Sequence, residues 1–120
     1  MTRVALFIGL SLFFVTPVRA VTGESPADAS LCGVFPKFYK EVIYNWMRSA
    51  LIDVDSAKIE WGAEPRPVLF KEKETGRQAY GWLVDFKVNA RNRFGAYTGK
   101  QSHAALIRDN VVIKTFGIGY

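Results

Sequence analysis

The sequence contains very few of the side chains that most enzymes use to move protons or bind metals. Cysteine and histidine each occur once among 120 residues, as Cys32 and His103. A lone cysteine excludes an internal disulfide, and zinc sites take several Cys or His ligands. We therefore expect no metal site and no cofactor. Cys32 is expected to be buried beside its apolar neighbours, and the alternative is a disulfide with a partner protein.

Candidate catalytic groups are correspondingly few. A Ser-His-Asp arrangement is assembled in space, but we expect His103 at the surface or at a strand end. Sugar hydrolysis requires a pair of carboxylates, and near the predicted sheet the sequence offers only Glu60, Glu64 and Asp85. We expect Glu60 and Asp85 at solvent-facing strand positions. The chain is thus expected to be non-catalytic, with a cell-wall hydrolase as a less favoured alternative.

Long apolar runs are also missing. The longest run, Val4 to Val15, has about a dozen residues, whereas a membrane-spanning helix needs roughly 20. Arg3 precedes this run. Val18 and Ala20 follow it, and they place small or medium-sized residues at the −3 and −1 positions of a cleavage site after Ala20. This layout is typical of a secretory signal peptide. We predict that residues 1–20 are a signal peptide and that the mature protein is periplasmic or secreted; the alternative is an uncleaved anchor.

The charge is modestly basic. The formal net charge is +5, and cleavage after residue 20 removes Arg3 and Arg19, which leaves +3. Nucleic acid is not an expected partner of an exported protein with so small an excess of positive charge. Residues 21–34 are small and polar, so we predict a flexible leader there, followed by a single domain over residues 35–120.

One amphipathic helix is predicted from about Pro36 to Leu51. Apolar residues recur there at steps of three and four, while polar residues fall on the other side. Pro36 suits the first turn of a helix. The expected fold is α+β, with this N-terminal helix packed on an antiparallel sheet of four to five strands.

The strands are predicted from alternation and turn signals. Residues 78–89 alternate most regularly, with Trp82, Val84 and Phe86 on one side and Leu83 and Asp85 on the other. Further strands are predicted at 57–61, 68–70, 102–107 and 111–116, the last two joined by a two-residue turn at Asp109 and Asn110. The predicted core comprises Phe38, Val42, Trp46, Trp82, Val84, Phe86, Leu106 and Val112.

The candidate binding site is a basic stretch. Residues 86–108 contain no acidic residue but five cations, namely Lys87, Arg91, Arg93, Lys100 and Arg108. The predicted binding residues are Asn89, Arg91, Asn92, Arg93, Tyr97 and Lys100. The expected partner is an envelope protein or an anionic envelope polymer. In the alternative, the cations are merely solvated, and Phe94 and Tyr97 cap the core.

Two segments resemble a known group of proteins. Residues 51–59 (LIDVDSAKI) resemble an "LkDPdSAKf" segment, and residues 88–99 (VNARNRFGAYTG) resemble a "VNAKNsfGGYtG" segment. Both occur, in this order, in small exported bacterial proteins and lipoproteins largely of unknown function. This chain has Val54 where proline is usual, Ala96 in place of a second glycine, and no cysteine just before Val88, where relatives often carry one.

The resemblance implies a cell-envelope protein of a Gram-negative bacterium, and it supplies neither a reaction nor catalytic residues. We therefore predict a non-catalytic periplasmic accessory or binding protein. The alternative is a component of a secretion or conjugation apparatus, in which Cys32 or the basic loop docks a larger subunit.

Overall fold

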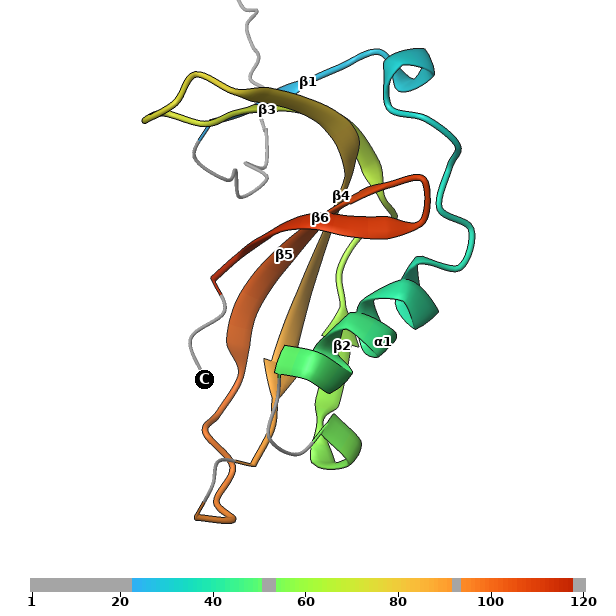
Figure 1. Ribbon diagram of the computed structural model, residues 1–120. Helices are drawn as coiled ribbons and strands as arrows, with labels where there is room; N and C mark the ends of the chain where they lie inside the picture. Colours follow the sequence, from blue (N-terminus) through green and yellow to red (C-terminus); the bar gives the residue numbers. More distant parts are fainter. Residues whose placement is uncertain (1–22, 51–53, 92–93, 118–120) are drawn as a thin grey trace, which may run out of the picture.

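A curved antiparallel sheet with one helix lying across it forms the protein (Figure 1). The computed structural model describes residues 23–50, 54–91 and 94–117, so the predicted signal peptide at 1–20 lies outside the described residues. No helix in the described ranges has the length and apolar character needed to cross a membrane. The α+β class and the antiparallel sheet are confirmed.

The longest strand organises the sheet. The elements are β1 (Glu24–Pro26), a 3₁₀ turn (Ala29–Leu31), α1 (Tyr39–Ala50), a second 3₁₀ turn (Val54–Ser56), β2 (Lys58–Trp61), β3 (Arg66–Lys71), β4 (Gln78–Asn89), β5 (Gln101–Arg108) and β6 (Val111–Phe116). Hydrogen-bonded neighbours follow the order β1-β3-β4-β5-β6, and β2 also pairs with β4. The first half of β4 pairs with β3 and its last residues pair with β2, so β2 and β3 share one side of β4.

The segment expected to be a flexible leader contributes a strand instead. Residues 24–26 form β1, which pairs with β3 through Glu24 opposite Phe70 and Pro26 opposite Val68. A strand of three residues is too short to show alternation, and its pairing partners lie far along the chain. The helix is consequently not N-terminal, because β1 precedes it.

The helix also begins later than predicted. It starts at Tyr39, since residues 36–38 form a turn in which the Tyr39 N–H donates to Pro36 O at 3.1 Å. Phe38 was expected in the core, but it is 64% exposed because it precedes the helix face that packs on the sheet. The buried helix residues are Ile43 and Met47. The predicted end at Leu51 lies outside the described residues.

The strand predictions hold more closely. The strand predicted at 78–89 matches β4, and the other four predicted strands match β2, β3, β5 and β6 to within about two residues at each end. Asp109 and Asn110 have φ angles of 52° and 64°, as the predicted two-residue hairpin turn requires.

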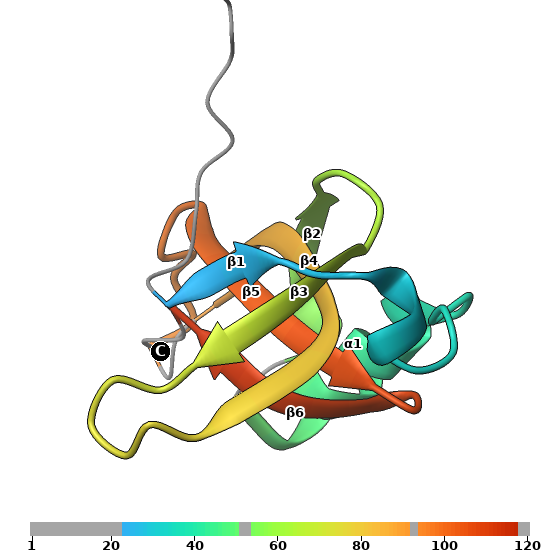
Figure 2. The same cartoon turned by 90° about the horizontal axis from the view of Figure 1, so that it is seen from above.

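Two apolar clusters, one on each face of the sheet, make the core. On the α1 side Val84 and Phe86 pack with Ile43 and Met47, as predicted for that face of β4. On the other side Leu83 is buried with Val68, Ala104 and Leu106, although alternation predicted an open face. This second cluster exists because the sheet curls (Figure 2). Phe70 of β3 meets Phe116 of β6 with ring centroids 5.1 Å apart, although the two strands are not neighbours in the sheet.

The other residues predicted to lie in the core are either buried or half-buried. Trp82, Val84, Phe86 and Leu106 are buried, as predicted. Val42, Trp46 and Val112 are half-buried and pack against the α1-side cluster. Cys32 is fully buried, with its Sγ 3.7 Å from the carbonyl oxygens of Asp28 and Val68, which confirms the predicted burial.

Candidate functional site

The loop between β4 and β5, residues 90–100, is the basic loop of the sequence prediction. Its ends are tied together by hydrogen bonds. The Thr98 N–H donates to Ala90 O at 3.2 Å, and the Gly99 N–H donates to the Asn89 side-chain oxygen at 3.0 Å. The backbones of Arg91 and Tyr97 form an isolated antiparallel bridge. Asn89, predicted to bind a partner, therefore has a structural role in closing the loop.

A second set of contacts anchors the basic loop to the start of β2. Ser56 is the centre of this anchor: its Oγ accepts from the Arg91 N–H at 3.2 Å, and its carbonyl oxygen accepts from the Tyr97 hydroxyl at 3.3 Å. The Lys58 ammonium lies 4.6 Å from the centroid of the Tyr97 ring. The two segments that carry the sequence resemblance thus contact each other in space. Ser56 and Lys58 were not predicted as site residues, and only the three-dimensional contact shows their role.

The two aromatic side chains of the basic loop are exposed although the backbone at the ends of the loop is held. Phe94 is 85% exposed and Tyr97 is 44% exposed, so the alternative in which they cap the core is wrong. Arg91 is also exposed. Asn92 and Arg93, both predicted to bind, lie outside the described residues.

Lys100 extends the cationic surface toward β2. Its ammonium lies 2.9 Å from Glu60 Oε1 on the exposed surface, and Lys87 is the strand partner of Glu60. The hydrogen bond and the charge of Lys100, helped by Lys87, lower the pKa of Glu60. A general acid for sugar hydrolysis needs a raised pKa, so Glu60 is poorly suited to that role.

A hollow of about 680 Å³ lies on the sheet between β2 and the end of β6. Pairing places Asp85 beside Ala104 and Lys87 beside Ser102, so these side chains share the face turned away from α1. Eleven residues border the hollow: Glu60, Trp61, Gly62, Asp85, Phe86, Lys87, Ser102, His103, Ala104, Phe116 and Gly117. The polar groups along it carry charges of both signs.

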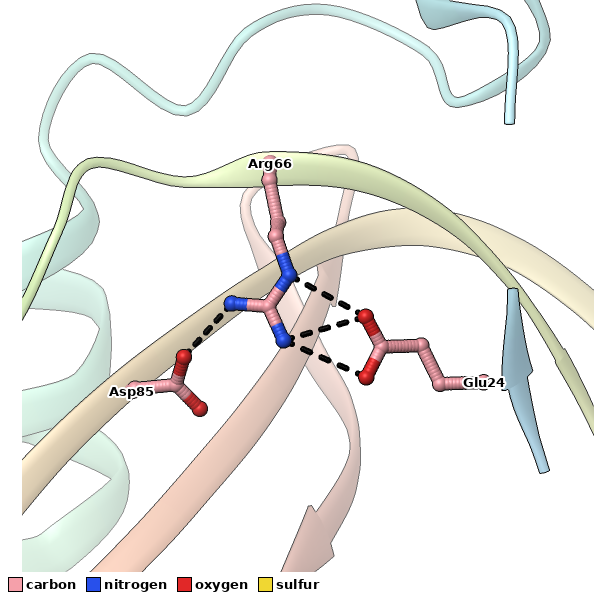
Figure 3. Close-up of polar contacts among 3 residues, drawn as sticks. All are labelled: Glu24, Arg66 and Asp85. Atoms are coloured by element: carbon pink, nitrogen blue, oxygen red, sulfur yellow. Dashed lines mark hydrogen bonds and ion pairs between the residues drawn. The ribbon is translucent and has the colours of Figure 1, made fainter. Parts of the chain in front are cut away.

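Asp85 belongs to an ion cluster next to this hollow (Figure 3). Arg66 donates from Nη1 to Asp85 Oδ2 at 2.5 Å, and from Nε and Nη2 to the carboxylate of Glu24 at 3.0 and 3.2 Å. Burial opposes the charge of Arg66, but its hydrogen bonds and ion pairs with Asp85 and Glu24 outweigh burial and raise its pKa. The cluster joins β1, β3 and β4, and the sequence did not reveal it because the three residues are far apart in the chain.

His103 is buried, with 4% of its surface exposed, whereas a surface or strand-end position was predicted. It is the third residue of β5, and its ring centroid lies 5.7 Å from that of its strand partner Phe86. Burial lowers the pKa of His103, and a hydrogen bond with the backbone of Gly117 opposes this only in part.

We expect stability to fall as the pH is lowered below about 6.5, the ordinary pKa of histidine. Below that pH the unfolded state binds a proton that folded His103 resists until its lower pKa is reached, so the slope is at most about 1.4 kcal/mol per pH unit. Urea unfolding between pH 5 and 8 measures it. A His103→Gln variant should lose this slope, and the same slope in the variant would contradict the assignment.

Comparison with known proteins adds nothing to this geometry: no family model, no curated protein and no solved structure matches the chain. Function is therefore inferred from contacts within the chain. The structure brings Arg91, Tyr97 and Lys100 to one end of the sheet, and it adds Lys58 and Phe94 to them.

Proposed function

We propose that this protein is a non-catalytic binding or accessory protein of the bacterial cell envelope, and that it contacts an anionic partner through the basic loop. One observation carries the proposal. The loop backbone is fastened at both ends and to Ser56, yet Phe94 and Tyr97 remain exposed, and the Lys58 ammonium lies over the Tyr97 ring. Exposed aromatic side chains on a loop that is held at its ends are typical of contact surfaces.

The physical advantage of such a loop is that little order has to be gained on binding. Hydrogen bonds from Thr98 to Ala90 O and from Gly99 to the Asn89 side-chain oxygen already restrict the backbone, so association costs less conformational entropy. Aromatic and arginine side chains are the residues that most often dominate binding energy. Arg91 and Lys58 would supply attraction to carboxylates or phosphates, and that attraction weakens with salt.

The location in the envelope rests on the sequence. Residues 1–20 have the layout of a signal peptide, and the two resembling segments occur in exported bacterial proteins. An anionic envelope protein and an anionic envelope polymer both present the required charge. The experiment below separates these two partners.

The triple variant Arg91→Gln, Phe94→Ser, Lys100→Gln should capture at least about tenfold less partner than the wild type from envelope extracts. Its melting temperature should stay nearly unchanged, because the three side chains are exposed. Immobilised mature protein, followed by mass spectrometry and sugar analysis of the eluate, measures capture and tells protein from polymer.

A matched control removes the same side-chain types elsewhere. Lys73→Gln and Arg77→Gln remove two exposed charges from the β3–β4 turn, which lies at the opposite end of the sheet from the basic loop (Figure 1). Phe38→Ser removes an aromatic ring that is 64% exposed. Equal capture by the loop variant and the wild type, with the control also unchanged, would overturn the proposed function.

A further inference from the structure

Two rows of side chains cross the hollow on the face of the sheet turned away from α1. The first row consists of strand partners: Asp85 of β4, Ala104 of β5 and Phe116 of β6. All three border the hollow, and Ala104 and Phe116 give it an apolar floor, because they are part of the apolar cluster on this face. Gly62, whose N–H donates to Asp85 O at 2.9 Å, has no side chain that could cover Asp85. The Asp85 side chain is 36% exposed.

The Asp85 end of the hollow is negative although Asp85 is ion-paired. Arg66 donates from Nη1 to Asp85, and it donates from Nε and Nη2 to Glu24. One guanidinium thus faces two carboxylates, and the three groups together carry a net negative charge. Arg66 contacts one carboxylate oxygen of Asp85, and Figure 3 shows the other oxygen turned away from the guanidinium. This end of the hollow therefore favours an ammonium group over an anion.

The second row forms a positive end. Lys87 lies between its strand partners Glu60 and Ser102, and all three border the hollow. The Lys100 ammonium lies 2.9 Å from Glu60, so two lysines share one carboxylate. Lys58, two residues before Glu60 on the same face of β2, adds to this positive charge. The Ser102 hydroxyl can also donate a hydrogen bond. This end therefore favours a carboxylate.

The two ends are held at a fixed spacing. Asp85 and Lys87 are two residues apart on β4, which corresponds to about 7 Å along a strand. His103 also borders the hollow, but burial lowers its pKa, so it adds no charge at pH 7. The hollow thus has a negative end, a positive end and an apolar floor between strands that pair with one another.

From these two ends we infer that the hollow binds a small zwitterion, or the zwitterionic part of a larger molecule, with a short neutral chain between its ammonium and its carboxylate. The ammonium lies at Asp85, the carboxylate lies at Lys87 and Ser102, and the chain between them lies near Ala104. Short peptides and ω-amino acids belong to this chemical class. A volume of about 680 Å³ is typical of small-molecule sites.

The first probe is 6-aminohexanoate, in which five methylene groups separate the two charges. NMR of isotope-labelled mature protein at pH 7 should show saturable shifts in residues 85–87 and 102–104. Hexanoate lacks the ammonium and hexylamine lacks the carboxylate, so each should bind at least about tenfold more weakly, as expected for the loss of one charged contact. Changing the ligand tests the Asp85 end while Asp85 itself, which also holds β3 and β4 together, is left in place.

The second probe is diglycine, which has a similar spacing of charges but a peptide group between them. Saturable binding of either probe supports the site, and the tighter of the two tells an ω-amino acid from a peptide as the source of the zwitterion. No saturable binding of either probe would overturn the site. Equal binding of hexanoate or hexylamine and 6-aminohexanoate would also overturn it, because only one charge would then matter.

Side-chain variants locate the site. Lys87→Gln should weaken the binding of 6-aminohexanoate about tenfold and leave that of hexylamine unchanged, because only the carboxylate end is lost. Ser102→Tyr places a ring in the hollow from an exposed strand position and should weaken every probe at least about tenfold. The control Gln101→Tyr places the same ring at the neighbouring exposed position, on the opposite face of β5, and should bind as the wild type does. Equal weakening by Gln101→Tyr, or wild-type binding by Lys87→Gln, would overturn the site.

The hollow site goes beyond the proposed function, because it uses neither Arg91 nor Phe94, and the two proposals fail independently. The double variant Arg91→Gln, Phe94→Ser leaves Lys100 in place and should bind 6-aminohexanoate as the wild type does; loss of binding would contradict a separate site. Reduced capture by the basic-loop triple variant, together with no zwitterion binding to the wild type, leaves the proposed function standing and removes only the hollow site. Unchanged capture with zwitterion binding intact does the reverse.

Discussion

Replacing Trp82 by alanine should lower the free energy of unfolding by about 3–5 kcal/mol. Trp82 is 7% exposed and belongs to the centre of β4. Its indole N–H donates to Gly33 O at 3.3 Å, and the Phe35 ring meets it edge-on with centroids 5.1 Å apart. The variant thus loses buried apolar area, an aromatic pair and the attachment of residues 33–35 to the sheet.

Urea unfolding followed by circular dichroism measures this loss without relying on tryptophan fluorescence. The matched control is Phe38→Ala, which removes a ring that is 64% exposed and should cost about 0.5 kcal/mol or less. A loss below about 1 kcal/mol for Trp82→Ala would contradict the core position of this side chain.

Replacing Arg66 by methionine should lower the free energy of unfolding by about 2–3 kcal/mol. Removing one partner of a fully buried ion pair costs about 3–5 kcal/mol because a buried charge is left behind. Here the Glu24 side chain is 10% exposed but that of Asp85 is 36% exposed, so water screens part of the loss. Urea unfolding at pH 7 measures the change.

A double-mutant cycle assigns that loss to the ion cluster. Glu24→Gln combined with Arg66→Met should cost less than the sum of the single changes, because both remove the same interaction. Amide exchange in β1 should quicken in either single variant, since Glu24 ties β1 to β3. The control Lys100→Met breaks the exposed pair with Glu60 and should leave the free energy of unfolding nearly unchanged. Strict additivity of Glu24 and Arg66 would show that the contact contributes nothing.

Charged residues of this protein have two roles: those of the ion cluster hold strands together, and those at the basic loop lie at the surface. Arg66 and Asp85 hold β3 and β4 together, although the sequence predicted a solvent-facing position for Asp85. Arg91 and Tyr97 lie at the surface on the anchored basic loop, and Lys58 of β2 lies beside Tyr97. Which charged groups hold strands together and which lie at the surface is therefore shown only by the contacts.

Several features could be predicted from the sequence because they depend on near neighbours in the chain. Alternation over residues 78–89 identifies β4, and the conformational tolerance of Asp109 and Asn110 identifies the β5–β6 turn. Cys32 is buried as predicted, but against Val68 of β3, because the neighbours Leu31 and Val34 on which the prediction rested are exposed. The helix was expected from its period of three and four, although its first turn was placed three residues too early.

The tertiary structure alone decided the rest, because burial and pairing depend on residues far apart in sequence. The three residues of β1 are a strand only because β3 lies beside them, and Leu83 is buried only because the sheet curls. His103 was expected to be exposed, but it is buried by the strand packed against it. The basic loop is anchored at Ser56, which lies 35 residues before Arg91 in the sequence. Local periodicity indicates whether a segment prefers to form a helix or a strand. Whether a given side chain is buried or exposed depends instead on contacts with residues that only the folded structure brings close.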